Sequence, residues 1–306
     1  MKRARRWVAG IAVLIATGSC VEAVPPPPQS LPPVVMVTSP PPVPRAAPVP
    51  LGDFTLKGSL IQGGLVLGKA PAGTASLMFD GAPVPVAADG SFVIAFDRDA
   101  GPVATLEARS DGAETVSRTL SISPRAWAIS RLATLPKYPV PPADFDRIRP
   151  GEIARINAAR KIAVESAGWR QPFLWPATGR ISTLFGSQRI YKNGVAGAYH
   201  SGIDIAVPQG TPVLAPADGV VTLASDHPFL LEGNLLLVAH GMGVESAFMH
   251  LSRIVVTPGQ RVGRGQVIAF SGATGRVTGP HLHWSLRWRS AKIDPLLVAG
   301  PMPGRE

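Results

Sequence analysis

The stretch GPHLHW contains two histidines one residue apart, His281 and His283, in a chain of 306 residues with only six histidines. In a β-strand, side chains two residues apart project from the same face, about 7 Å apart along the strand. Both imidazoles could therefore bind one metal ion, or one could bind the metal while its neighbour faces a water molecule. The spacing alone does not choose between these arrangements.

A second pair with the chemistry of a metal site is His200 and Asp204, in YHSGIDIAVPQGTPV. A spacing of four would share a helix face, but the surrounding glycines and prolines argue against a helix. Positions i and i+4 also share a face in an extended chain, and Gly202 between them has no side chain to crowd the space. A neutral imidazole and a carboxylate that project together are ligands of the kind that zinc takes. The spacing is weak evidence by itself, because it recurs by chance.

One of the remaining histidines is a candidate for the same site. His250 ends the strand expected for SAFMHLS, in which Phe248 and His250 should lie on one face and Met249 on the other. The other two, in SDHPF and VAHGMG, lack the company of the candidate residues. We expect structural roles for both, with His227 on a loop and His240 at a strand end before a turn.

The strands that would carry these residues lie in residues 173–298, where apolar and polar residues alternate. Gly-rich turns such as PADG, HGMG and TPGQ separate the segments. The pattern predicts a mostly antiparallel β-domain. The alternating segments are RISTLFG, GVVTLAS, NLLLVAH, GVESAFMH, GQVIAFSG and HLHWSLR.

Residues 51–123 show the same alternation in shorter segments, namely FTLKGSL, ASLMFDG, SFVIAFD and ATLEARS. Turn sequences interrupt them about every 8 to 12 residues, which is typical of a small antiparallel β-sandwich. This region has no cluster of titratable residues. We therefore expect it to be an accessory or scaffold module.

Residues 124–172 are expected to form a linker that contains one helix. The stretch PGEIARINAARKIAVESAGWR has Pro150 at a helix start, an acidic residue in the first turn and apolar residues at near-helical spacing. These signals predict a helix over 151–167. It would connect the two modules, or it would lie against a catalytic groove and restrict access to it.

Taken in order, HSGID, GTPVLAP, DGVV, HLS and TGPHLHW resemble the M23 (LytM/lysostaphin-type) metallopeptidase family. The resemblance covers residues 173–298 and implies an antiparallel β-sheet catalytic domain of the LytM type. N-terminal to residue 170 the likeness is only general, to exported wall peptidases with several modules. The family's zinc ligands fall on His200, Asp204 and His283.

The family's two histidines that are not ligands fall on His250 and His281, so no motif position is lost. The resemblance implies zinc, which lowers the pKa of a bound water toward neutrality. His281, beside a ligand, is placed to orient or deprotonate that water. His250 would stabilise the oxyanion or protonate the leaving amine. The chain has no HExxH glutamate base, so imidazoles must take its role, and their division of duties stays open.

The expected function, by resemblance, is a zinc metalloendopeptidase that hydrolyses stem peptides or peptide cross-links of peptidoglycan. The D-alanyl–diaminopimelyl cross-link is the bond expected in a Gram-negative envelope. Two alternatives stay open: a non-catalytic LytM-like activator of a cell-wall amidase, and a metallopeptidase that acts on glycine-rich proteins. Activators of the first kind usually lose metal ligands, which this chain retains.

Residues 1–23 have the features of a secretory signal: the basic start MKRARRW, a short apolar run and then TGSC. The only cysteine, Cys20, lies where a lipoprotein signal places its acylated residue, although Thr17 stands where Leu, Val or Ile is usual. The alternative is ordinary cleavage after Ala23. We expect an exported, periplasmic protein without an internal disulfide, anchored to the outer membrane if Cys20 is lipidated.

The proline-rich residues 24–50 predict an extended spacer, with a proline-motif ligand as the alternative, and residues 299–306 a short tail. The net charge of +10 favours polyanionic partners. The arginines are scattered and no nucleic-acid-binding motif occurs, so we expect no nucleic-acid partner. An acidic cell wall fits the charge.

Overall fold

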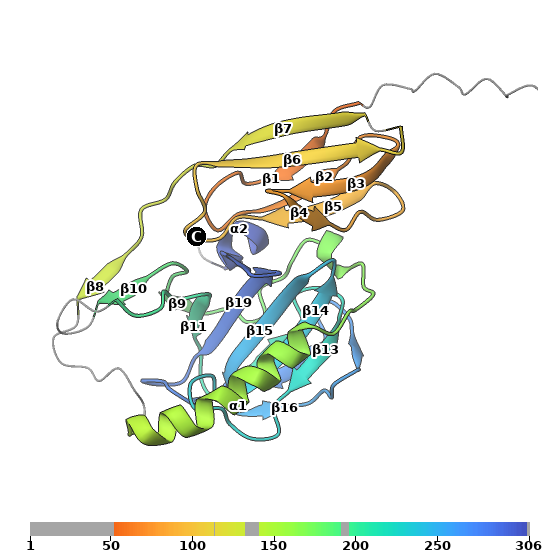
Figure 1. Cartoon of the computed structure of the whole chain (residues 1–306). Helices are drawn as coiled ribbons and strands as arrows, with labels where there is room; N and C mark the ends of the chain where they lie inside the picture. Colours follow the sequence, from red (N-terminus) through yellow and green to blue (C-terminus); the bar gives the residue numbers. More distant parts are fainter. Residues whose placement is uncertain (1–51, 113, 132–140, 191–195, 305–306) are drawn as a thin grey trace, which may run out of the picture. The chain divides into compact units, whose positions relative to one another are not determined.

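Figure 1 shows the computed structural model of the chain, coloured along the sequence. The expected signal peptide with Cys20 and the spacer at 24–50 lie outside the residues that the structure describes. Within the described ranges, no helix has both the length and the apolar character needed to cross a membrane. The described residues are 52–112, 114–131, 141–190 and 196–304.

The first part of the described chain forms two antiparallel sheets with a shared buried core, which confirms the expected β-sandwich. One sheet has the order β1-β2-β5 and the other the order β4-β3-β6-β7. Leu77, Phe92 and Leu106 are fully buried between them. The strands are β1 (Thr55–Gly58), β2 (Leu65–Lys69), β3 (Thr74–Phe79), β4 (Ala82–Val84), β5 (Ser91–Ala95), β6 (Val103–Ser110) and β7 (Thr115–Ser121).

The alternation of apolar and polar residues does not predict strand β2, because Gly68 interrupts the pattern. Gly68 pairs with Phe92 of β5, and a Cβ on Gly68 would lie 2.2 Å from the Phe92 ring. A glycine inside a strand often marks such a close approach. The same residue that weakens the strand signal therefore makes room for a core aromatic ring.

The C-terminal part is built on one large sheet and one small sheet. All the expected strands occur, five of them in the large sheet and one, β18, in the small sheet. The large sheet has the order β17-β13-β14-β15-β19-β11-β9, with β20 paired to β19, and the small sheet has the order β12-β18-β16. Two short strands, β8 (Ile129–Arg131) and β10 (Gln188–Ile190), pair in parallel. The remaining strands are β9 (Arg180–Thr183), β11 (Ile203–Ala206), β12 (Pro212–Leu214), β13 (Gly219–Ala224), β14 (Asn234–Gly241), β15 (Val244–Leu251), β16 (Arg253–Ile254), β17 (Arg261–Val262), β18 (Val267–Phe270), β19 (Leu282–Trp288) and β20 (Ala291–Ile293); a 3₁₀ turn, η1 (Gly168–Arg170), precedes them, and α2 (Pro295–Ala299) follows.

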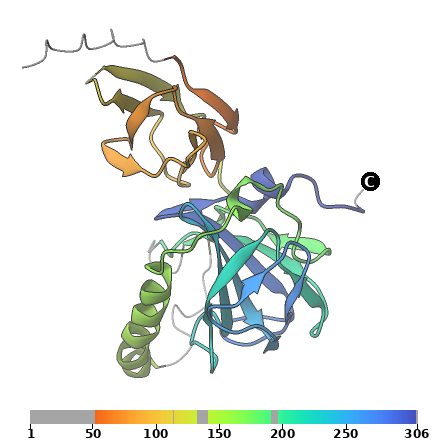
Figure 2. The same ribbon diagram turned by 90° about the vertical axis from the view of Figure 1, so that its right-hand side faces the viewer.

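The two faces of the large sheet bury different residues, as the period-two alternation requires. Trp284 of β19 and Phe248 of β15 point into the main core. Leu237 of β14 and Ala247 of β15 point to the opposite face, where they belong to a second, smaller cluster. Helix α1 packs on this second face through Ile156 and completes the cluster. Figure 2 shows α1 lying along one side of the sheet.

Helix α1 spans Pro142–Arg160, so the bounds predicted for it, 151–167, were wrong at both ends. Pro142 lies in the first turn and Asp144 follows it, which are the same start signals that the sequence repeats at Pro150. The helix begins at the first of the two signals. Pro150 lies inside the helix. It removes one backbone hydrogen bond, but the helix continues past it.

A buried ionic network attaches α1 to the loop before β14. Arg149 forms two 2.6 Å hydrogen bonds to Glu232 and one of 3.0 Å to Glu152. Glu152 also accepts a 2.7 Å hydrogen bond from the Leu230 N–H. Burial lowers the pKa of Arg149, but the two carboxylates outweigh it and raise the pKa above its ordinary value. A bidentate, charge-assisted pair of this kind fixes both position and angle.

At the C-terminal end of α1, the Arg160 Nε lies 3.1 Å from a carboxylate oxygen of Glu245 on β15. The helix is thus held to the sheet by ionic contacts at its middle and at its C-terminal end, and by apolar contacts between them.

Replacing Arg149 by Met should lower the free energy of unfolding by about 3 kcal/mol, because the two buried glutamates then lose their cation. Arg147→Met on the same helix is the control, since Arg147 pairs with Asp144 at the surface, and it should cost less than about 1 kcal/mol. Denaturant unfolding of both variants measures the difference. Equal losses would show that the Arg149 network does not hold the helix.

Candidate metal centre

Strand register places two of the candidate ligands side by side. Asp204 of β11 pairs with His283 of β19, and His283 in turn pairs with Met249 of β15. Directly paired residues on neighbouring strands point to the same face. Because Met249 packs against the cluster under α1, the Asp204 and His283 side chains belong to that second face of the sheet.

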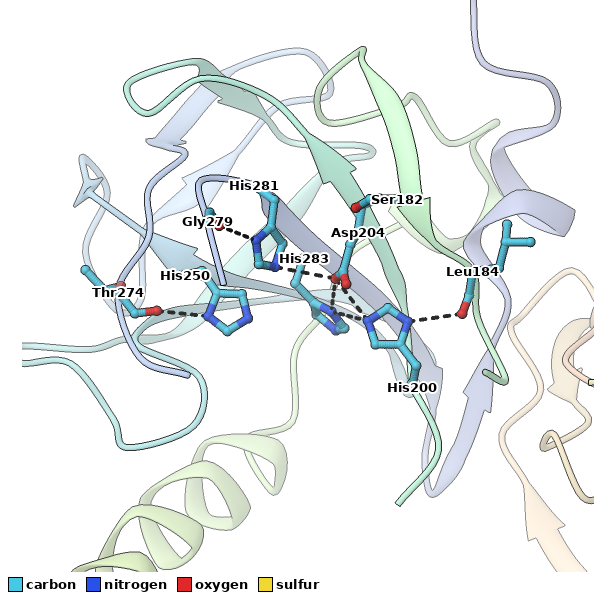
Figure 3. A network of polar contacts seen from close by, with 9 residues as sticks. All are labelled: Ser182, Leu184, His200, Asp204, His250, Thr274, Gly279, His281 and His283. Atoms are coloured by element: carbon cyan, nitrogen blue, oxygen red, sulfur yellow. Dashed lines mark hydrogen bonds and ion pairs between the residues drawn. The ribbon is translucent and has the colours of Figure 1, made fainter. Parts of the chain in front are cut away.

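Three acceptor atoms converge at this point, as Figure 3 shows. The His283 Nδ1 lies 2.8 Å from Asp204 Oδ1, and the His200 Nε2 lies 3.0 Å from both of those atoms. His200 comes from the segment before β11. The three residues form the one His/Cys/Asp/Glu group suited to a metal among the described residues.

The His283 ring directs its Nδ1 toward His200 and Asp204. Its Nε2 is buried without a hydrogen-bond partner in the described structure. That orientation depends on Gly202, because a Cβ there would lie 2.8 Å from His283 Nε2 and 2.4 Å from the Trp284 carbonyl oxygen. A residue with a side chain at 202 would push the ring out of place. Glycine between His200 and Asp204 is therefore a steric requirement of the third ligand.

A backbone carbonyl fixes the tautomer of His200. The His200 Nδ1–H donates to the Leu184 carbonyl at 3.1 Å, which leaves the Nε2 lone pair directed at Asp204 and His283. A partner of this kind on the far nitrogen is the usual support of a metal-binding histidine. Burial raises the pKa of Asp204, but the close contacts with His200 and His283 outweigh it and lower the pKa below its ordinary value, so the carboxyl stays ionised. Burial lowers the pKa of His283, which favours its neutral form.

His250 reaches the site from an unexpected direction. The register places Met249, not His250, on the face of His283, so the expected alternation around His250 was wrong. A φ of +63° at His250 breaks the strand pattern and turns the residue toward the other histidines. Its ring centroid lies 4.8 Å from that of His281. Such a backbone conformation is uncommon in a non-glycine residue and costs energy, so it persists only where the surroundings hold it, as they often do at functional sites.

Neighbouring loops hold His250 in this conformation. Its Nδ1–H donates to the Thr274 carbonyl at 2.9 Å, and its backbone N–H donates to the Glu232 carbonyl at 2.8 Å. Burial and the nearby charge of His283 lower the pKa of His250 to about 4. The ring is therefore neutral, with the Nε2 lone pair on the side away from Thr274.

His281 precedes β19 and is held in the same way. Its Nδ1–H donates to the Gly279 carbonyl at 2.8 Å, and its Nε2 lies 3.7 Å from Asp204 Oδ1. The structure thus brings together all five residues singled out in the sequence, with His281 beside the three converging acceptors and His250 behind it.

The donor set fits a zinc ion. Two neutral imidazole nitrogens and one carboxylate oxygen are borderline ligands of the type zinc prefers, and three protein ligands leave a further position for water or substrate. A cation between them would also relieve the repulsion of three acceptors that lie within 3.0 Å of one another. The carbonyls of Leu184, Thr274 and Gly279 were missed in the sequence because a backbone acceptor has no side-chain signal.

The two remaining histidines lie apart from the site. His227 is exposed on a bend beside Asp226, and Arg155 of α1 contacts both. His240 in β14 is fully buried: its Nδ1–H donates to the Asp218 carbonyl at 2.9 Å, and its Nε2 accepts from the Ser246 hydroxyl at 2.8 Å. These contacts satisfy a neutral ring, and burial lowers the pKa of His240 to about 4.

Comparisons with known proteins concern mainly the part of the chain that carries the site. Residues 198–295 match the sequence profile described as Peptidase family M23. The chain is 43% identical over 123 residues to peptidoglycan DD-endopeptidase ShyA of Vibrio cholerae and 40% identical over 144 residues to DD-carboxypeptidase/endopeptidase Mpg of Neisseria meningitidis. These alignments cover 40% and 47% of this chain but only 28% and 32% of the relatives, so the chain spans less than a third of their length.

A solved structure matches a larger share of the chain. The crystal structure of a Pseudomonas aeruginosa protein described as a peptidase M23 is 30% identical, with a TM-score of 0.60. The match covers 79% of this chain and 96% of that one. It therefore extends well beyond residues 198–295.

The buried His240 gives a pH prediction. In the unfolded chain its pKa is near 6.5, whereas in the folded chain it is about 4, so between these values only the unfolded state gains a proton. The free energy of unfolding should therefore fall as pH falls from about 6.5 to about 4. His240→Gln should remove about 3 kcal/mol of that fall. Urea unfolding across this pH range measures it, and parallel curves for the two proteins would contradict the assignment.

Proposed function

Because the chain belongs to peptidase family M23, we propose that it is a zinc metalloendopeptidase that hydrolyses the peptide part of peptidoglycan. The observation that carries the proposal is the convergence of His200, Asp204 and His283, whose acceptor atoms lie within 3.0 Å of one another. Relatives named as peptidoglycan DD-endopeptidases support the substrate class and favour a D-alanyl–diaminopimelyl cross-link as the bond. A non-catalytic activator of an amidase would not need the complete set of five residues.

The proposed ligands are His200 through Nε2, His283 through Nδ1 and Asp204 through Oδ1, each held by the contacts described above. Zinc bound there would polarise the scissile carbonyl and lower the pKa of water. His281 and His250 both have Nδ1–H tied to a carbonyl, so each presents an Nε2 lone pair that can accept a proton. His281, nearer to the ligands, would take the proton of the attacking water. His250 would pass a proton to the leaving amine.

We also propose a division of the chain into modules. Residues 51–123 form an accessory domain, 124–172 a linker with α1, 173–298 the peptidase domain and 299–306 a tail. The start of the peptidase domain before the family match at 198 is supported by β9, which pairs with β11, and by the Leu184 carbonyl, which orients His200.

Purified protein should release peptide fragments from isolated sacculi, and a chelator should abolish the release because the metal site is lost. His283→Ala should lose zinc and activity together, since a ligand is missing. His281→Ala should retain zinc and lose at least about 100-fold in activity, because only the proton acceptor is gone. Mass spectrometry of the fragments and metal analysis of each variant measure these outcomes.

His227→Ala is the matched control, because the contacts of this exposed histidine with the described residues are to Asp226, Arg155 and Phe229, away from the metal site. It should retain both zinc and activity. The proposal fails if the native protein contains no zinc and its action on sacculi is insensitive to chelator. The assignment of His281 fails if its alanine variant loses zinc.

We propose that the protein is exported to the periplasm and anchored to the outer membrane through a lipidated Cys20. The support is the basic and apolar start of the chain and the position of its only cysteine. Cys20→Ser should move the protein from the membrane fraction to the soluble periplasmic fraction, as immunoblots of fractionated cells would show. If the native protein is already soluble, cleavage after Ala23 is the correct alternative.

A further inference from the structure

The face of the sheet that carries the metal site continues along β19 into a second charged region. Every second residue of β19 points to this face, which gives the series His283, Ser285 and Arg287, paired across β15 with Met249, Ala247 and Glu245. Arg287 therefore lies four residues from His283, at about 13 Å along the strand. Ser285 between them is partly exposed, so α1 does not completely cover this strip of β19.

A cavity of about 430 Å³ lies at this end of the sheet. The last residues of α1 and the segment that follows it, 159–164, form one wall. Most of the other lining residues come from β14, β15 and β19 and the turns beside them. The first wall lies outside residues 198–295, the range that matches the family profile.

The lining of the cavity has an excess of positive charge. Four cations line it and only one carboxylate, Glu245, which is already bound to one of the four, Arg160. The cations are Arg160, Lys161, Arg287 and Arg289.

Arg287 is the central cation of this group. Its Nε–H donates to the Arg289 carbonyl, but within the described residues its two terminal nitrogens make no hydrogen bond or ion pair. Burial and the neighbouring charge of Arg160 lower the pKa of Arg287, and the charge of Glu245 on the paired strand only partly offsets them. A partly buried guanidinium with two free donors presents the fork that a carboxylate binds in bidentate fashion.

We infer that this cavity binds a free carboxylate of the peptide that is cleaved at the metal site. The inference rests on the proposed function. An extended peptide advances about 3.3 Å per residue, so a carboxylate three to four residues from the scissile bond would reach Arg287 along this partly exposed strip of β19. The cavity thus selects peptides by charge at a distance from the bond that breaks, and Arg287 is its specificity-determining residue.

The test compares two synthetic cross-linked peptides that differ only in the group three to four residues from the scissile bond, which is a carboxylate in one and a carboxamide in the other. The native protein should have a KM about tenfold lower for the carboxylate. Arg287→Gln should raise the KM for the carboxylate peptide about tenfold and leave kcat and the KM for the carboxamide unchanged. Arg109→Gln, which removes an exposed arginine of β6, is the control and should change neither.

An undiminished carboxylate preference in a folded Arg287→Gln protein would overturn the inference. If that variant does not fold, Arg289→Gln at the exposed rim of the cavity takes its place, with an expected rise in KM of about threefold. An unchanged KM in that variant overturns the inference equally. Thermal unfolding of each variant establishes which case applies.

Failure of the proposed function can be told apart from failure of the cavity. If the native protein cleaves neither peptide, the proposed function fails and the cavity is tested by binding alone. Fluorescence anisotropy with the labelled carboxylate peptide should then give a Kd about tenfold weaker for Arg287→Gln than for the native protein. Equal Kd values, or equal binding of the carboxamide peptide, would overturn the inference.

Competition by inorganic phosphate as strong as that by the carboxylate peptide would also overturn it, because the cavity would then be a general anion site.

Discussion

The arrangement of the site depends on the register between β11 and β19. With Asp204 opposite His283, a carboxylate and an imidazole from segments 79 residues apart come within 2.8 Å of each other. A slip by one residue would turn every side chain of one strand to the other face and separate the pair. The register is held by burial, because Ile203 and Trp284, which pair next to them, are completely inaccessible in the main core. Burial of Ile203 and Trp284 on one face of the sheet therefore positions Asp204 and His283 on the other face.

His250 shows a different kind of constraint. A strand alone could not direct it toward His281, and the left-handed backbone at this residue has to be maintained by its surroundings. The Glu232 carbonyl accepts its N–H, while the carboxylate of the same Glu232 is held by Arg149 of α1. A helix far from the histidine in sequence thus helps to support the loop against which the histidine is oriented.

Much of the fold and site could be predicted because the relevant signals are periodic or chemical. Strand alternation predicted most strands of the large sheet. Because the chain has only six histidines, their motifs predicted the residues that meet on the second face of that sheet. The errors have local causes. The start of α1 was wrong because the proline and acidic start signal occurs twice, at Pro142 and at Pro150. Gly68 interrupts the alternation of β2 and weakens its signal. The positive φ of His250 turns its side chain to the face opposite to the one expected. The carbonyls of Leu184, Thr274 and Gly279 depend on loop paths, which side-chain types do not encode.

The packing of α1 has a consequence for what counts as the smallest folding unit. A fragment that began at the family match would lack Ile156 and Ala159, and the apolar residues of β14 and β15 beneath them would face water. It would also leave Glu232 and Glu245 without their arginines. A fragment that keeps these contacts therefore has to start upstream of Pro142, because α1 lies outside the residues that match the family profile.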